Sequence, residues 1–245
     1  GTFLSLWHDY DPAALDSLAS IGWAYDDGSA LATFVNATLI TGLFSILLGG
    51  GLVAVARSGA GKMASESNAS LTALLFSVLT AAALLLPTIL GLLADLSAEN
   101  ETLLQDLFMH SLRAFIIIAV MINVLLTVAQ RKGETIQASN WFVFMALASF
   151  IFGSQFRFFG ELADSTQVVW LGERMTQSWV MISLFFAVAY HLVPRAASRP
   201  IWSDSMTKAS MLLLFFTLPP FMMSSADAGT LLENLGAILM TLALL

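Results

Sequence analysis

Long uncharged runs alternate with short charged segments along most of the chain, and this pattern predicts membrane-spanning helices. A transmembrane helix needs about 20 mostly apolar residues. Backbone amides in lipid must be satisfied within their own segment, so each uncharged run is expected to be a helix. To within a few residues, the runs predict seven spans, at 30–56, 69–94, 106–130, 139–163, 166–193, 207–224 and 230–245. The predicted fold class is an all-α, polytopic membrane helix bundle over 30–245, preceded by an acidic segment over 1–29.

The composition agrees with a membrane location and excludes several other classes of protein. The chain is 58% hydrophobic and 11% charged, with a mean hydropathy of +0.81, whereas a typical soluble domain is about 25% charged. These values exclude a soluble globule and a disordered chain. A net charge of −7 with ten Lys and Arg residues gives no support to nucleic-acid binding. The absence of Cys excludes disulfides and thiolate metal sites.

The charges between the spans predict the orientation of the chain. Basic residues mark the cytoplasmic side of a membrane protein, and here they follow the first, third and fifth spans, at Arg57, Lys62, Arg131, Lys132, Arg195 and Arg199. The other loops and the N-terminal segment are acidic. We therefore expect the N-terminus outside the cytoplasm. Because no signal peptide precedes Gly1 and the last span lacks a basic stop, we also expect the sequence to be part of a longer polytopic protein.

Several short motifs do not carry the chemistry that they superficially suggest. The stretch 58–63 lacks the first Gly and the final Ser or Thr of a phosphate-binding loop, with Ala56 and Met63 in their places. We interpret it as a flexible basic loop. The glycines at 49–51 are interpreted as helix-packing residues. A retinal protein would need a Lys deep in its last helix, which is missing here. The three histidines are not placed to share a metal, at His8, His110 and His191.

The C-terminal third of the chain resembles a known family of membrane enzymes. Its motifs, in order, are Tyr190-x-Leu192-Val193-Pro194-Arg195, then Ser203-Asp204-Ser205-Met206, then Pro219-Pro220-Phe221-Met222-Met223, then Ala226-Asp227-Ala228-Gly229. This order resembles the catalytic subunit I of the heme–copper oxygen reductases (the cytochrome c oxidase and nitric oxide reductase superfamily), most closely the B family. The resemblance implies that the seven spans correspond to helices two to eight of that subunit.

The resemblance also implies where metal ligands would lie, and the sequence lacks them. The family holds copper with three His residues, and the corresponding positions here are Met175, Met222 and Met223. The His ligand of the low-spin heme corresponds to Asn36, and a cross-linked Tyr corresponds to Trp179. We therefore predict neither copper nor heme and no other cofactor. Thioethers favour Cu(I), but Met is also an adaptable filler of apolar gaps, and packing is the preferred interpretation.

Ionisable residues lie on the outer thirds of the predicted helices, at His110, Arg113, Arg157, Glu161, Glu173 and Arg174. One interpretation is that the Arg side chains reach to the membrane interface. The other is a charged network that fills the volume of the lost heme and copper, and that could hold an anionic headgroup. On the second interpretation Arg157 pairs with Glu161 or Glu173. Beside them we expect Trp179, Met175, Met222 and one of three phenylalanines to meet, namely Phe152, Phe156 or Phe159.

The resemblance without the ligands predicts a non-catalytic structural subunit of a respiratory electron-transfer complex, in a prokaryotic cytoplasmic membrane. Its expected partners are other membrane subunits, lipid and quinone. One alternative is an active oxygen or nitric oxide reductase with displaced ligands, or with ligands outside this sequence. A second alternative is a membrane transporter, for which the sequence shows neither a broken-helix pair nor an inverted repeat.

Overall fold

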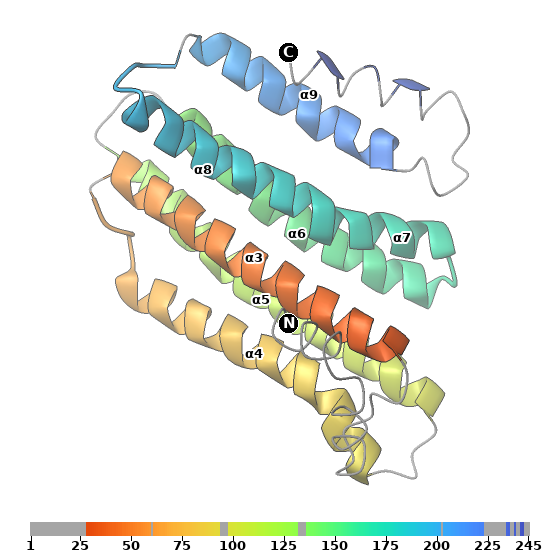
Figure 1. Ribbon diagram of the computed structural model, residues 1–245. Helices are drawn as coiled ribbons and strands as arrows, with labels where there is room; N and C mark the ends of the chain where they lie inside the picture. The colour runs from red at the N-terminus through yellow and green to blue at the C-terminus, as the bar shows by residue number, and fades with distance from the viewer. Residues whose placement is uncertain are drawn as a thin grey trace.

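The computed structural model describes residues 28–59, 61–93, 98–131, 136–201 and 203–222, with isolated residues between 234 and 242. This part of the chain is helical and has no strand (Figure 1). Its elements are α3 (Gly28–Ser58), α4 (Glu66–Leu93), α5 (Ala98–Ala129), α6 (Ala138–Leu162), α7 (Thr166–Arg174), the π-helical turn η1 (Met175–Trp179), α8 (Val180–Ala196) and α9 (Asp204–Met222). A helix overlaps each of the first six expected spans, and α7, η1 and α8 together cover the fifth. The acidic segment and most of the seventh span lie outside the described residues.

Helix α6 is the central element of the described bundle. It packs against α5 on one side and against α7, η1 and α8 on the other, while α3 crosses the space between α5 and α8. Helix α4 lies at one edge of the bundle and α9 at the opposite edge (Figure 1). The α6–α7 pair therefore has neighbours on both sides.

Four helical segments are long and apolar enough to cross a membrane, at Thr41–Ser58, Leu112–Ala129, Ala138–Leu162 and Thr166–Ala196. Their outward faces are also apolar: Ile46 is 73% exposed and Phe115 is 68% exposed. Such faces would be costly in water but match a lipid environment. The described fold is therefore that of a membrane-embedded helix bundle.

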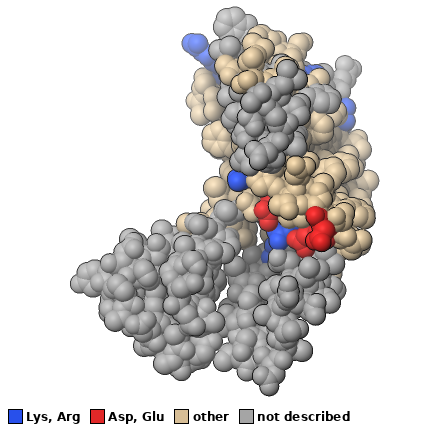
Figure 2. Space-filling model, turned by 90° about the vertical axis from the view of Figure 1, so that its right-hand side faces the viewer, with Lys and Arg blue, Asp and Glu red and all other residues tan. Residues whose placement is uncertain are grey.

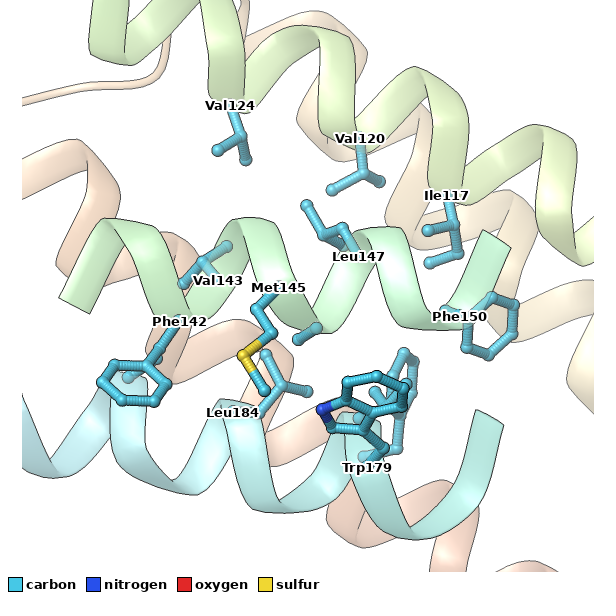
Figure 3. Close-up of a cluster of buried hydrophobic side chains, with 14 of the residues drawn as sticks. Ile117, Val120, Val124, Phe142, Val143, Met145, Leu147, Phe150, Trp179 and Leu184 are labelled. Atoms are coloured by element: carbon cyan, nitrogen blue, oxygen red, sulfur yellow. The ribbon is translucent and has the colours of Figure 1, made fainter. Parts of the chain in front are cut away.

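The core of the bundle lies on both sides of α6, where it packs against α5 and against α8 (Figure 3). Apolar side chains from all three helices are buried there, including Ile117, Val120, Val124, Phe142, Val143, Leu147 and Leu184. An aromatic cluster joins α3, α4 and α6. The ring of Phe44 lies 5.3 Å from that of Phe76 and 5.6 Å from that of Phe150. Helix packing thus continues from the core toward α4.

The turn between α6 and α7 is short and has a defined hydrogen-bond pattern. Asp164 adopts a left-handed conformation with φ 54°. The N–H of Ser165 donates to the carbonyl of Gly160 at 2.8 Å, and that of Asp164 donates to Glu161 at 3.3 Å. These two bonds form a Schellman motif, which satisfies carbonyls at a helix end and reverses the chain. The motif returns α7 along α6.

Replacing Asp164 with glycine is expected to stabilise the protein by about 0.5–1 kcal/mol, since the left-handed conformation is costly for residues with a Cβ. The measurement is the thermal unfolding midpoint in detergent. The matched control is Ala163→Gly, where φ is −96° and glycine offers no conformational relief. A lower midpoint for Asp164→Gly than for the unmodified chain would contradict this account of the turn.

Candidate functional site

Helices α6 and α7 approach so closely that three of their contact positions have no room for a side chain. A Cβ added to Gly172 would lie 2.5 Å from the backbone N of Arg157 and 2.6 Å from the carbonyl O of Gly153. One added to Gly153 would lie 2.8 Å from the Cβ of Met175, and Gly160 is similarly enclosed. Gly153 and Gly160 are two helical turns apart and share a face. Small residues of this kind let helix backbones meet in membranes.

An ion-pair cluster lies on the same helix pair. The Nε of Arg157 is 3.2 Å from Oε1 of Glu161, one turn along α6, and its Nη1 is 3.3 Å from Oε1 of Glu173 on α7. The Arg157 side chain is 17% exposed, against 18% for Glu161 and 40% for Glu173. One guanidinium thus serves two carboxylates and joins the two helices. The expected pairing of Arg157 with Glu161 or Glu173 is confirmed for both partners.

Other charged residues of the predicted network are placed differently. Arg174 is exposed, and its guanidinium carbon lies 5.3 Å from the ring centroid of Trp170, a cation–π contact. Figure 2 shows acidic and basic side chains gathered at the α6–α7 end, while the other charged side chains in this view are basic and scattered. Arg113 is half-buried on α5. His110 also lies on α5, and its side chain is outside the described residues.

The π-helical turn η1 places Met175 and Trp179 in the core, at 7% and 2% exposure. The indole ring of Trp179 lies between η1 and α6 (Figure 3) and 5.2 Å from the ring of Phe215 on α9. Its Nε1 is buried and has no hydrogen-bond partner among the described residues. The surroundings of Met175 and Trp179 are therefore those of a packed apolar core. Single π-turns inside helices are frequent at functional sites.

The expectation that phenylalanines of α6 fill this space is wrong. Phe152, Phe156 and Phe159 are 55%, 40% and 57% exposed. Their spacing of four and three residues puts them on one face of α6, and that face points away from the core, where apolar side chains suit lipid. The buried phenylalanine in this part of α6 is instead Phe150, at 8% exposure.

The described residues offer little for binding a metal. They contain no group of three or more His, Asp or Glu side chains that could hold one. Of the four positions at which the resemblance implies a ligand, only the side chain of Met175 is described. The side chains of Asn36 and Met222 lie outside the described residues, as does all of Met223. One thioether packed against Gly153 does not make a copper site, and we derive no chemistry through a metal.

A polar clamp at the opposite end of the bundle was not foreseen from the sequence. Asn123 of α5, 3% exposed, donates to the carbonyl of Ser65 at 2.8 Å and accepts from the N–H of Ser65 at 3.0 Å. Thr127 accepts from the N–H of Ala64 at 2.9 Å. The segment that directly follows the stretch 58–63 is therefore fixed to α5. Polar residues four apart on an apolar helix were the available signal.

Replacing Asn123 with leucine is expected to destabilise the protein by about 1–3 kcal/mol, because the N–H of Ser65 loses its partner. The carbonyl of Ser65 still accepts from the N–H of Ala69 at 3.1 Å. Hydrogen exchange at the amides of residues 64–66, together with the thermal midpoint, would measure the effect. Asn68→Leu is a suitable comparison, because the Asn68 side-chain oxygen has no hydrogen-bond partner among the described residues. Unchanged exchange in Asn123→Leu would show that the clamp does not hold the loop.

Another buried polar contact lies near the end of α8. His191 is 5% exposed, and its Nε2 is 2.9 Å from Nη1 of Arg195, one turn along the helix. The same end of the bundle holds Asn140 of α6, which exchanges hydrogen bonds with the hydroxyl of Ser58 at 2.8 and 3.1 Å. Charged and polar side chains thus lie at both ends of the bundle.

The comparisons with known proteins add no relative to this description. No family model matches the chain, and no curated protein or solved structure matches it.

Proposed function

We propose that this chain is a non-catalytic membrane subunit of a respiratory electron-transfer complex, similar in descent to subunit I of the heme–copper oxygen reductases. The ordered motifs between Tyr190 and Gly229 support the descent. The burial of Met175 and Trp179 is the observation that supports a non-catalytic role. At the positions where the resemblance implies a copper ligand and a cross-linked Tyr, two packed apolar side chains are 7% and 2% exposed.

The role we propose is structural. The glycine contacts and the Arg157 ion pairs join α6 and α7 into a firm unit. The exposed apolar faces on either side of the bundle are suited to contacts with other membrane subunits, with lipid and with quinone. A subunit of this kind would position a neighbouring redox subunit without holding a redox centre itself.

An optical spectrum and a metal analysis of the native complex test this proposal. The full-length chain would be tagged in its source organism, purified in mild detergent with its partners, and then separated from them. We expect heme absorption to stay with the partner subunits and the separated chain to carry neither heme nor copper. A heme band on the separated chain would overturn the proposal in favour of an active reductase, as would near-stoichiometric copper that is lost in Met222→Ala. Purification without any redox subunit would also overturn it.

We also propose that the N-terminal side of the described bundle faces away from the cytoplasm of a prokaryotic cell. The support is the alternation of basic and acidic loops, which follows the positive-inside rule. A cysteine introduced at Ser97 is expected to react with an impermeant thiol reagent in intact cells. One introduced at the exposed Lys62 is expected to react only after the membrane is permeabilised. The reverse result would overturn both the orientation and the alignment with the oxidase subunit.

A further inference from the structure

An apolar groove of about 340 Å³ lies along one face of α8 near its C-terminal end. Its floor is formed by residues spaced three and four apart along the helix and one that follows it directly. Counted from Phe186 as position 0, they stand at positions 0, 3, 4, 7, 8 and 11, namely Phe186, Ala189, Tyr190, Val193, Pro194 and Ala197. These positions form a continuous stripe on a helix. At 1.5 Å per residue the stripe is roughly 16 Å long. The groove is therefore long enough to take part of a linear apolar chain.

The segment after α8 closes one side of this groove. Ser198 adopts φ 52°, and the N–H of Arg199 donates to the carbonyl of Pro194 at 3.0 Å. This is again a Schellman turn, and it brings Arg199, Pro200 and Ile201 back alongside α8 as the wall of the groove. Among the described residues, α9 packs mainly on α6 and α7, which leaves this face of α8 uncovered by it.

The groove has one charged side chain, and it lies at the end of the groove. Arg199 is exposed, and its guanidinium has no ion-pair partner among the described residues. Tyr190 stacks on Phe142 of α6 with ring centroids 5.3 Å apart. This contact holds the Tyr190 side chain in place in the floor of the groove. The groove is thus apolar along its length and cationic at one end.

The position of the groove matches the depth of a phospholipid. The helical segment Thr166–Ala196 has 31 residues and is therefore about 46 Å long, as long as a bilayer with its headgroups, which is about 40–45 Å thick. The end at Ala196 then lies among the headgroups, with Arg199 just beyond it. The Phe186 end lies about 16 Å deeper, within the hydrocarbon region.

We propose that this groove binds an anionic phospholipid, with an acyl chain along the α8 stripe and the phosphate against Arg199. The charge at the end of the groove favours an anionic lipid over a quinone, whose ring is uncharged. An acyl chain would be buried against the six positions of the stripe. The phosphate would make one charge-assisted contact with Arg199 at the charged end. The proposal requires only that the bundle spans a membrane, and it is independent of the role in a respiratory complex.

Native mass spectrometry of the full-length protein tests the proposal. The protein would be released from nanodiscs that contain equal amounts of phosphatidylglycerol and phosphatidylcholine. We expect one phosphatidylglycerol per chain to survive conditions that strip phosphatidylcholine. Equal retention of the two lipids would overturn the proposal, as would retention of a quinone in place of lipid, or displacement of the lipid by glycerol phosphate alone.

Two pairs of variants locate the site. Arg199→Gln is expected to weaken retention of phosphatidylglycerol about fivefold, the effect of one basic residue at an anionic membrane surface. Lys62→Gln removes an exposed charge outside the groove and should have no effect. Val193→Phe fills the groove at a residue that is 62% exposed, so it should abolish retention without harming the fold. Its control is Leu192→Phe, at 53% exposure outside the groove. Equal effects within either pair would overturn the proposal.

Discussion

Replacing Gly172 with alanine is expected to cost about 3 kcal/mol of stability, the upper end of the effects seen when a packed core receives an extra methyl group. The added Cβ would lie 2.5 Å from the backbone N of Arg157 and 2.6 Å from the carbonyl of Gly153. Both are backbone atoms, so no side chain can rotate away, and α7 must move off α6. Thermal unfolding of the detergent-solubilised protein, followed by circular dichroism, would measure the loss.

Gly49→Ala is the matched control, because it adds the same methyl group where nothing lies within 4 Å. Alanine favours a helix over glycine by about 1 kcal/mol, so this variant should be neutral or slightly more stable. Gly160→Ala should behave like Gly172→Ala, since its Cβ would lie 2.6 Å from the backbone N of Val169. Similar midpoints for Gly49→Ala and Gly172→Ala would refute the close helix contact.

Replacing Arg157 with methionine is expected to destabilise the protein by about 1–3 kcal/mol, less than the loss of one partner from a fully buried ion pair, because these side chains are partly exposed. Methionine keeps most of the side-chain volume and removes the charge. The carboxylate of Glu161, 18% exposed, would then lie unpaired at the edge of an apolar core. Glu173 is 40% exposed and should contribute less, because water can reach it. The thermal midpoint in detergent again gives the measurement.

A rescue experiment separates charge from packing at this position. Adding Glu161→Gln to Arg157→Met removes the unpaired carboxylate and should recover a large part of the lost stability. Arg174→Met serves as the control, because this exposed residue lies over the face of Trp170, and its replacement should cost less than 1 kcal/mol. If the double variant were no more stable than Arg157→Met alone, the ion pairs would not be the source of the effect.

The positions of the helices could be predicted from the sequence because charges bound the apolar runs. The expected span 139–163 matches α6 (Ala138–Leu162) to within one residue at each end, and 166–193 coincides with α7 through most of α8. Charge counting measures length along the chain but not direction around a helix. The sequence therefore could not show that Phe152, Phe156 and Phe159 face outward, because both lipid and a protein core accept phenylalanine.

The site was only partly predictable for a related reason. The spacing of Arg157 and Glu161 is visible in the sequence, but the approach of Glu173 depends on how α7 folds back through the Asp164 turn. The role of Gly172 depends on the backbone of another helix. Asn123 was overlooked because its partner is the main chain of Ser65, and a main-chain partner leaves no mark on composition or charge.

The π-turn at Met175–Trp179 also sets the phase of the helix that contains it. In an unbroken α-helix the buried residues of α8, such as Val180, Leu184 and Ala187, would lie some 60–120° around from Gly172. The extra residue in the wide turn shifts the phase by nearly 100°, so that both halves present one straight seam to α6. Deleting a single residue between 175 and 179 would therefore separate the seam into two, with either the glycine contact or the α8 core facing lipid.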